Sequence, residues 1–387
     1  MRVALVGDEF YPDIGGAAHY AYDLSLQLAK LGVEVVVVTH AHPGQPEEEE
    51  IAGVRIRRIE GLVLDNPHRA VSPLLFRRCH KYILHAEFDV VHGLDIYSFM
   101  APLAVRFAHR HRIPSVMTCH TVMDSRFLTF WEHVLGSALR LRSADRLIAV
   151  SQASARFSHL LGFPEKRITV IPNGVDLSCF NGKIDALLTR KELGIGDKPL
   201  VVTASRLIKR KSPGLLISAF ARVLKVMPDA KLVIAGSGRE ENDLSRRVRD
   251  LNIADSVFMV GGMGKEEVAQ LMAAANVFVL PSKLESFGLS LLEASAAGVP
   301  VVCSNAGGVP EVFRDGFNAL LYPPGDYDAM AKAIVHVIQD TELAKKISAN
   351  ALKTARRFTW EMTAKQILRV YEEVVRENTS TGSRYRH

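Results

Sequence analysis

Cysteine is scarce in this chain, and its spacing excludes two classes of protein. The 387 residues contain four cysteines: Cys79, Cys119, Cys179 and Cys303. None of them forms a CxxC metal or redox motif, and four in so long a chain do not make a disulfide framework. We therefore expect reduced thiols and a core that is large enough to fold without cross-links.

Long apolar runs are also missing, and the first residues predict no secretory leader. No run approaches the ~18 apolar residues of a membrane-spanning helix, and Asp8 and Glu9 come too early for a signal peptide. The net charge of +6 and the pI of about 9.1 suit an anionic ligand or surface but select none. We expect a cytoplasmic protein, with peripheral contact to the inner face of the membrane as an open alternative.

Short apolar runs alternate with segments of helical periodicity, which is typical of parallel α/β sheets. The expected strands of the first half are 2–7, 33–40, 54–59, 88–93, 114–120, 146–151 and 168–174, and those of the second half are 199–206, 230–238, 256–262, 276–282 and 299–305. The first helix is expected over 17–31, and the acidic run 47–50 is interpreted as a solvated loop. The sequence thus predicts two doubly wound, Rossmann-like domains.

The polar, glycine-containing stretch between the two series separates the domains. We expect a first domain over 1–177, a linker over 178–198 and a second domain over 199–358. The tail forms an amphipathic helix, and the segment 359–387 is expected to cross back onto the first domain. Ligands of doubly wound sheets bind beyond the carboxyl ends of the strands, so residues just after each strand are the candidates for function.

Two glycine motifs follow predicted strands, and neither is specific. Gly15 and Gly16 lie between the first strand and its helix, where they could allow a ligand to approach the backbone. Gly236 and Gly238 could contact a phosphate or a base, or could simply form a turn. Neither motif completes GxGxxG, so the dinucleotide fingerprint is absent.

A cluster of cations follows the first strand of the second domain. Arg206 and Lys211 lie in the segment RLIKRKSPG, which runs into a predicted helix. Cations at a helix N-terminus oppose the helix dipole, so the arrangement favours an anion, such as a diphosphate, among them. The alternative is a solvated basic turn.

The strongest constellation is the segment ESFGLSLLE, from Glu285 to Glu293. We expect Glu285 to lie at the junction between the loop and the helix SLLEASAAG, where the amides of the next three residues would be free helix-start donors for an anion. Those residues are Ser286, Phe287 and Gly288. The two carboxylates would then bind hydroxyl groups on either side of the phosphate. Two ordinary helical glutamates are the alternative.

His120 ends a predicted strand of the first domain. An imidazole there could donate a hydrogen bond or transfer a proton. The chain has fourteen histidines, so this position by itself is weak support for a role in function.

Taken in order, these segments resemble glycosyltransferase family 4. They are GG (15–16), IPNGVD (171–176), SRLIKRKSPG (205–214), GSG (236–238), ESFGLSLLE (285–293) and GGVPEV (307–312). The resemblance covers nearly the whole chain and implies a GT-B fold, with two Rossmann-like domains and a donor site in the cleft between them. FYPDIGG, VEVVVVTHAH and SRLIKRKS are most like the catalytic subunit of phosphatidylinositol N-acetylglucosaminyltransferase.

The resemblance also implies an activity: retaining, metal-independent transfer of a sugar from a UDP-sugar, such as UDP-GlcNAc or UDP-glucose. No cofactor and no nucleic-acid partner are implied, and the acceptor could be lipid-linked. Arg206 and Lys211 would hold the diphosphate, Glu285 the sugar hydroxyls and Glu293 the ribose. The amides of 286–288 would face the phosphate or the sugar, Gly16 would let the first-domain loop approach the phosphate, and His120 would contact the donor sugar.

One departure affects the acceptor side. Many relatives have Glu and then His after the glycine pair, where this chain has Ala18 and Tyr20. Two other classes of protein remain open: a non-hydrolysing sugar-nucleotide epimerase and a two-lobed binding protein. The former would need acid/base carboxylates in the first domain, where only Asp8 and Asp95 follow strands. The latter leaves the Arg–Lys and Glu–Glu pairs unexplained.

A basic segment over 69–83 interleaves cations with apolar residues. Arg69, Arg77, Arg78 and Lys81 alternate with leucines, Phe76, Tyr82 and Ile83. Such a segment could lie on an anionic bilayer. The alternative is an ordinary helix whose apolar residues face the core. We hypothesise that the first domain docks on the cytoplasmic leaflet and takes a lipid-linked acceptor there.

Overall fold

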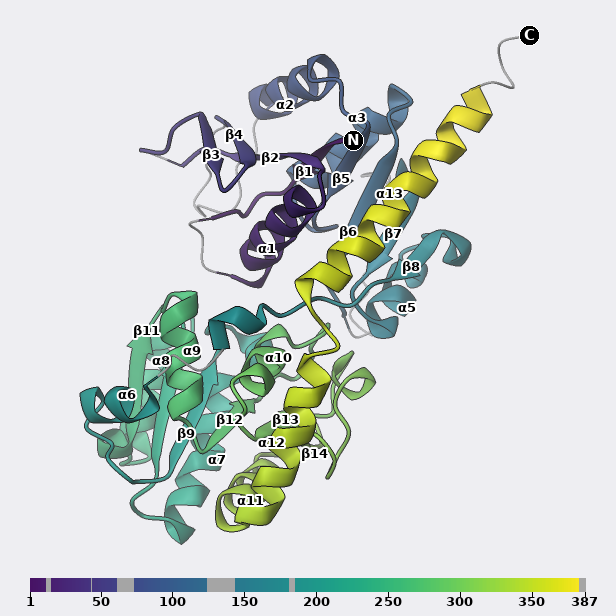
Figure 1. Ribbon diagram of the computed structural model, residues 1–387. Coiled ribbons are helices and arrows are strands. Elements are labelled where there is room, and N and C mark those ends of the chain that lie inside the picture. Colours follow the sequence, from purple (N-terminus) through teal and green to yellow (C-terminus); the bar gives the residue numbers. More distant parts are fainter. Residues whose placement is uncertain (12–14, 43, 61–72, 124–142, 181–184, 383–387) are drawn as a thin grey trace. The chain divides into compact units, whose positions relative to one another are not determined.

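The structure is a computed structural model, and it describes residues 1–11, 15–42, 44–60, 73–123, 143–180 and 185–382 (Figure 1). The chain forms two compact units. Unit 1 consists of Met1–Gly174 and Trp360–His387, and unit 2 of Val175–Thr359. Among the described residues, no helix is long and apolar enough to span a membrane.

Unit 1 is built on a sheet of eight described strands in the order β3-β4-β2-β1-β5-β6-β7-β8. The strands are β1 (Arg2–Val6), β2 (Glu34–His40), β3 (Glu48–Ile51), β4 (Val54–Ile59), β5 (Val90–Gly93), β6 (Ser115–Cys119), β7 (Arg146–Ala149) and β8 (Ile168–Val170). The helices are α1 (Gly16–Lys30), α2 (Pro73–His85), α3 (Met100–Arg110), α5 (Gln152–Leu160) and α13 (Trp360–Gly382). All pairings are parallel except β3 with β4. The predicted parallel sheet is confirmed.

The edge strand β3 corrects the expectation of a solvated acidic loop. Glu48–Ile51 pairs antiparallel with β4. Its acids meet the arginines of β4: Glu48 lies 2.5 Å from Arg57, and Glu49 lies 2.6 Å from the buried Arg58. Glutamate by itself disfavours a strand, but its attraction to arginines on the neighbouring strand stabilises this edge of the sheet.

The C-terminal helix α13 is part of unit 1 and packs on α1. Its buried residues Ile367, Tyr371 and Val374 recur at helical spacing. Thr363 donates a hydrogen bond to the carbonyl oxygen of Pro172 at 2.9 Å. These contacts attach the last helix to the sheet of unit 1.

Unit 2 is built on a sheet of six described strands, all parallel, in the order β11-β10-β9-β12-β13-β14. They are β9 (Leu200–Ala204), β10 (Lys231–Ala235), β11 (Val257–Gly261), β12 (Val277–Leu280), β13 (Val301–Ser304) and β14 (Leu320–Tyr322). The helices are α6 (Ala186–Glu192), α7 (Pro213–Val226), α8 (Glu241–Asp250), α9 (Lys265–Ala274), α10 (Leu289–Ala296), α11 (Tyr327–Gln339) and α12 (Thr341–Ala355). Counted along the chain, this is the order 3-2-1-4-5-6 of the Rossmann fold.

The stretch 178–198, expected as a linker, lies within unit 2 where it is described. It contains α6, whose first turn is capped by the Asp185 carboxylate. Arg190 donates to the carbonyl oxygen of Ala274 at 2.8 Å and so attaches α6 to the end of α9. The linker was predicted from the polar composition of this stretch. Its polar side chains, such as Arg190, instead form hydrogen bonds with the backbone of unit 2.

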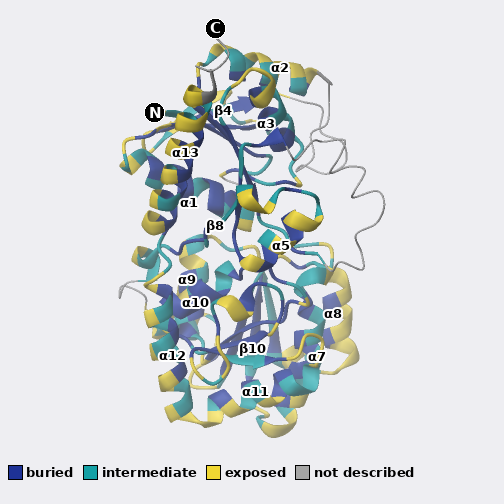
Figure 2. Ribbon diagram, turned by 90° about the vertical axis from the view of Figure 1, so that its right-hand side faces the viewer, coloured by how far each residue is buried: buried dark blue, intermediate teal, exposed yellow. Residues whose placement is uncertain are grey.

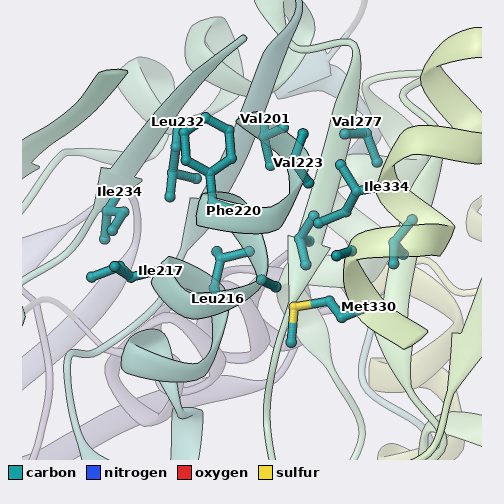
Figure 3. Close-up of a cluster of buried hydrophobic side chains, with 14 of the residues drawn as sticks. Val201, Leu216, Ile217, Phe220, Val223, Leu232, Ile234, Val277, Met330 and Ile334 are labelled. Carbon is teal, nitrogen blue, oxygen red and sulfur yellow. The ribbon is translucent and has the colours of Figure 1, made fainter. Parts of the chain in front are cut away.

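Both sheets have buried strands, as Figure 2 shows in dark blue, while exposed residues lie mainly on the helices. In unit 2 the core lies between the sheet and helices α7 and α11 (Figure 3). Phe220 of α7 lies near Leu232 and Val201 in this cluster, and all three are fully buried. This core fixes the strand ends that carry the candidate site.

Candidate functional site

The sheet order of unit 2 places its topological switch point between β9 and β12, where ligands of such sheets bind. These strands pair in register, with Phe278 opposite Val202. Arg206 follows β9, and Glu285 follows β12. The backbone amide of Lys283 donates to the carbonyl oxygen of Arg210 at 3.0 Å and joins the two loops beyond the strands.

Lys211 and Glu285 form an ion pair at this point. The ammonium Nζ of Lys211 lies 2.5 Å from Oε2 of Glu285, and the two side chains are 15% and 8% exposed. The hydroxyl of Ser282 donates to the same carboxylate oxygen at 3.2 Å. The structure thus brings together two of the residues that the sequence predicted, and it adds Ser282.

The charge of Glu285 is set by opposing effects. Burial raises the pKa of this carboxyl, but Lys211, Arg210 and the Ser282 hydroxyl lower it by more, so that the pKa lies below its ordinary value. Glu285 is therefore an ionised hydrogen-bond acceptor at neutral pH. Such a group suits the binding of hydroxyl donors.

Arg206 lies on the same loop as Lys211, and its side chain is exposed. The loop is held by the neighbouring GSG segment: the amide of Leu207 donates to the carbonyl oxygen of Ser237 at 2.8 Å. The 3-10 turn Lys209–Lys211 and the left-handed Ser212 then lead into α7, which begins with Pro213. The cations therefore precede the N-terminus of α7, as the sequence predicted.

Gly236 and Gly238 have a structural reason to be glycine. A Cβ on Gly236 would lie 1.9 Å from the carbonyl oxygen of Ser205, and one on Gly238 would lie 2.4 Å from that of Leu207. Their amides are also engaged: Gly236 donates to the carbonyl oxygen of Gly261 and Gly238 to the carboxylate of Glu241, both at 2.6 Å. These glycines shape the loop that carries Arg206.

Helix α10 begins four residues after the expected junction at Glu285. It runs from Leu289, with Gly288 as a left-handed N-cap at φ 88°. Ser286, Phe287 and Gly288 therefore precede the helix, and the Ser286 amide points to the carboxylate of Glu285 at 3.2 Å. The reason is steric, since the αL conformation of Gly288 breaks the helical path. In the first turn, the amides of Leu291 and Leu292 donate to the carbonyl oxygen of Gly288, at 2.9 and 3.4 Å.

Other predicted residues have clear places around this helix. The ring of Phe287 is buried and packs edge-on against Phe358 at 6.0 Å. Glu293 lies on α10 and is half-buried. The carbonyl oxygen of Glu285 accepts from the amide of Gly308 at 2.9 Å, and Gly307 leaves no room there for a side chain. The GGVPEV segment thus supports the backbone of Glu285.

Gly16 and His120 belong to unit 1. Gly16 is the first residue of α1, and a Cβ built on it would meet no described atom within 4 Å. His120 follows β6 and is half-buried. Burial lowers its pKa to about 4, although a hydrogen bond with the backbone of Leu94 acts in the opposite direction. The imidazole is thus neutral at neutral pH.

The two acids that follow strands of unit 1 differ in role. Asp8 caps α3, because its carboxylate accepts from the amides of Phe99 at 2.7 Å and Met100 at 3.0 Å. Burial raises the pKa of Asp95 to about 7, with the charges of Glu9 and Asp8 adding to it and backbone amides opposing it. The sequence shows that both acids follow strands. Only the structure shows that Asp8 is a helix cap and that Asp95 is the carboxyl with a raised pKa.

The described residues contain no group of three or more His, Cys, Asp or Glu side chains placed to hold a metal ion. In the basic helix α2, the apolar residues Leu75, Cys79 and Ile83 belong to the core. Arg77 and Lys81 are exposed, whereas Arg69 lies outside the described residues. The helix therefore faces the core with most of its apolar side, and its exposed side is mainly basic.

Comparison with known proteins identifies both halves. The model of Glycosyltransferase Family 4 matches residues 14–178, and that of Glycosyl transferases group 1 matches residues 186–354. The D-inositol 3-phosphate glycosyltransferase of Kineococcus radiotolerans is 31% identical over 98% of this chain and 97% of its own. That of Frankia alni is 33% identical over 94% and 95%.

Solved structures share the fold. HepE of Anabaena, crystallised with UDP and glucose, superimposes with a TM-score of 0.81 at 23% identity over 96% of this chain and 100% of its own. Sucrose-phosphate synthase of Thermosynechococcus elongatus gives a TM-score of 0.78 at 25% identity, over 97% and 99%. Together with the two Rossmann-like sheets, these matches confirm the predicted GT-B fold. The chain therefore belongs to glycosyltransferase family 4 and is a glycosyltransferase that takes its sugar from a nucleotide sugar.

Proposed function

We propose that the protein transfers a hexosyl group, N-acetylglucosaminyl or glucosyl, from its UDP-sugar to an acceptor hydroxyl with retention of anomeric configuration. The observation that carries this proposal is the buried Lys211–Glu285 pair at the switch point of unit 2. It offers a cation for a diphosphate and an ionised acceptor for sugar hydroxyls within one hydrogen-bond length of each other.

Lys211 can serve both partners at once. An ammonium has three donors, so it can hold the Glu285 carboxylate while it donates to a phosphate oxygen. Arg206, exposed on the same loop, adds a second cation. Both would stabilise the charge that develops on the leaving diphosphate as the bond from the anomeric carbon breaks. With these two cations in place, we propose that the reaction needs no metal ion.

Glu285 would orient the sugar by accepting from its hydroxyls, and Glu293 would accept from the ribose. The first amides of α10 and its positive dipole end favour an anion between the two carboxylates. His120, neutral at neutral pH, would contact the donor sugar as a hydrogen-bonding group without adding a charge. Gly16 would leave space for the phosphate at the glycine loop.

The proposed mechanism is a front-face displacement. The acceptor oxygen forms its bond to the anomeric carbon on the side from which the diphosphate leaves. The proton of the acceptor hydroxyl passes to the departing phosphate oxygen. The side chains of the protein then need only to position the donor and the acceptor and to neutralise the charge of the leaving diphosphate. No side chain has to act as a nucleophile.

For the acceptor, we propose a phosphorylated inositol. The relatives from Kineococcus radiotolerans and Frankia alni carry D-inositol 3-phosphate in their names, and neither is a phosphatidylinositol N-acetylglucosaminyltransferase. An inositol phosphate can be free or lipid-linked. Leu75 and Ile83 of α2 lie in the core and so do not face a bilayer. For this reason we favour the free acceptor. The exposed cations of α2, Arg77 and Lys81, are the feature that would support a lipid-linked acceptor.

The test is a matrix of donors and acceptors. UDP-GlcNAc, UDP-glucose, a GDP-sugar and an ADP-sugar are each combined with free inositol phosphate or with vesicles that contain phosphatidylinositol. Release of the nucleoside diphosphate is measured, and the anomeric configuration of the product is read by NMR. UDP release with a retained product is expected.

Several outcomes would refute the proposal. An inverted product would contradict the front-face mechanism. A donor epimer formed without acceptor would identify an epimerase, and binding of UDP-sugar without release in any combination would identify a binding protein. Glu285→Gln is the matched variant, since it keeps the shape of the side chain and removes its charge. It should lose transfer.

A further inference from the structure

Three rings from three elements of unit 1 form a contiguous stack. Tyr20 of α1 meets His120, which follows β6, with ring centroids 4.2 Å apart and planes at 71°. Tyr20 also meets Trp360, the first residue of α13, with ring centroids 5.4 Å apart and planes at 70°. Both contacts are edge-to-face, which is the geometry that aromatic pairs prefer.

Tyr20 is almost fully enclosed, and the Nε2 atom of His120 is also shielded from solvent. Tyr20 and Trp360 are only 1% and 3% exposed, and His120 is half-buried at the end of its strand. One side of the His120 imidazole is therefore covered by the ring of Tyr20, which cannot move without disturbing α1 and α13.

The strand that leads to His120 is held by a chain of hydrogen bonds. Thr118 lies on β6, two residues before His120. Its hydroxyl lies 2.6 Å from Nε2 of the buried His92, and Nδ1 of His92 lies 2.6 Å from the hydroxyl of Tyr371 on α13. The backbone of β6 is thus fixed, and the side chain of His120 is held by the backbone of Leu94 and the ring of Tyr20.

We propose that Tyr20 is a positioning residue for His120: its ring holds the imidazole in one orientation at the carboxyl end of β6 and keeps water from that side. Trp360 supports the Tyr20 ring through its own edge-to-face contact. The inference rests on the proposed contact of His120 with the donor sugar, and it adds a residue that no part of that proposal requires.

The groups that face His120 agree with this role. They are Tyr20 from α1, Trp360 of α13 in contact with that tyrosine, the neutral His92 from β5 and the backbone of Leu94. His92 adds little charge, because burial lowers its own pKa to about 3. Burial is also the main reason for the low pKa of His120. Removing the ring of Tyr20 would admit water and let the pKa of His120 rise toward its ordinary value of 6.5.

The experiment titrates His120 by NMR in the full-length protein with labelled histidine, without donor. His120→Ala assigns the signal by its loss. Tyr20→Phe keeps the ring, Tyr20→Leu removes it, and Tyr322→Leu is the matched control, because Tyr322 is a buried tyrosine of unit 2. The dependence of kcat on pH is measured for the same proteins.

The ring, not the hydroxyl, should decide the result. In Tyr20→Leu the pKa of His120 should rise toward 6.5, and kcat should fall by about tenfold or more, because misplaced groups cost rate steeply. In Tyr20→Phe both should stay near those of the unmodified protein, and in Tyr322→Leu the titration should not change. If Tyr20→Leu does not fold, Trp360→Leu decides, with a smaller rise expected.

Two results would overturn the inference: an unchanged titration of His120 in the ring-less variant, or an equal rise in the Tyr322→Leu control. Failure of the proposed function gives a different pattern. In that case His120→Ala would transfer sugar normally, while the titration in Tyr20→Leu would still shift.

Discussion

Removing the cation of the buried pair is the most informative perturbation of the site. In Lys211→Met, the Glu285 carboxylate keeps its burial and loses its main counter-charge. Because both side chains of the pair are mostly shielded from solvent, removing one partner should destabilise the protein by about 3–5 kcal/mol. The same variant should lower kcat by about 10²–10³-fold through the loss of a donor aimed at developing charge.

A double-mutant cycle separates this pair from general damage. Lys211→Met, Glu285→Gln and the double variant are unfolded in urea, and the coupling free energy is computed from the four stabilities. The matched control is Lys345→Met with Glu342→Gln, since that ion pair is 74% and 82% exposed. We expect a coupling of about 2 kcal/mol or more for the buried pair and below about 1 kcal/mol for the exposed one.

The pH dependence of the free energy of unfolding has a defined sign. The pKa of Glu285 is lowered in the folded protein, so its contribution to stability is present above its unfolded pKa and is lost as the pH falls through the folded value. In Lys211→Met that pKa rises, and this loss on acidification should shrink or disappear. Equal coupling in the two cycles, or an unchanged acid dependence in Lys211→Met, would refute the reasoning.

Four further predictions concern single features. Glu293→Ala should raise the KM for the donor with little change in kcat, and steady-state kinetics that leave KM unaltered would contradict its ribose contact. Transfer should survive excess EDTA in full, whereas loss of activity restored only by Mg²⁺ or Mn²⁺ would show a metal requirement. Gly307→Ala should destabilise the protein far more than Gly298→Ala in urea unfolding, because a Cβ at 307 would lie 1.9 Å from a backbone oxygen and one at 298 would meet nothing within 4 Å. If the acceptor is lipid-linked, Arg77→Glu with Lys81→Glu should reduce co-sedimentation with anionic liposomes; equal co-sedimentation of the double variant would leave the basic face of α2 without that role.

The sequence alone determined the fold class and the loops to inspect. Apolar runs of strand length alternating with helical periodicity require a parallel sheet covered by helices, because buried strands are apolar on both faces. The carboxyl ends of such strands then select Arg206, Lys211 and Glu285 as candidates. These inferences need only patterns within a few residues, which the sequence displays directly.

Local patterns failed where a partner from another strand decided the outcome. The acidic run at 47–50 reads as a loop by composition, yet Glu48–Ile51 is a strand because the arginines of β4 face it. The sequence also left open whether Gly236 and Gly238 contact a ligand or form a turn, and only the approach of the loop at Ser205–Leu207 shows why glycine is required there. The late start of α10 depends on the backbone conformation of Gly288.

Only the tertiary structure paired Lys211 with Glu285 and placed Tyr20 against His120. Each pair joins elements that are distant in the chain and become neighbours through the order of strands in a sheet or the packing of a helix on it. The period of a pattern shows which face of an element is buried, but it does not show which other element covers that face. For this reason the sequence supplied the chemical groups of the site, and the sheet order and helix packing supplied their partners.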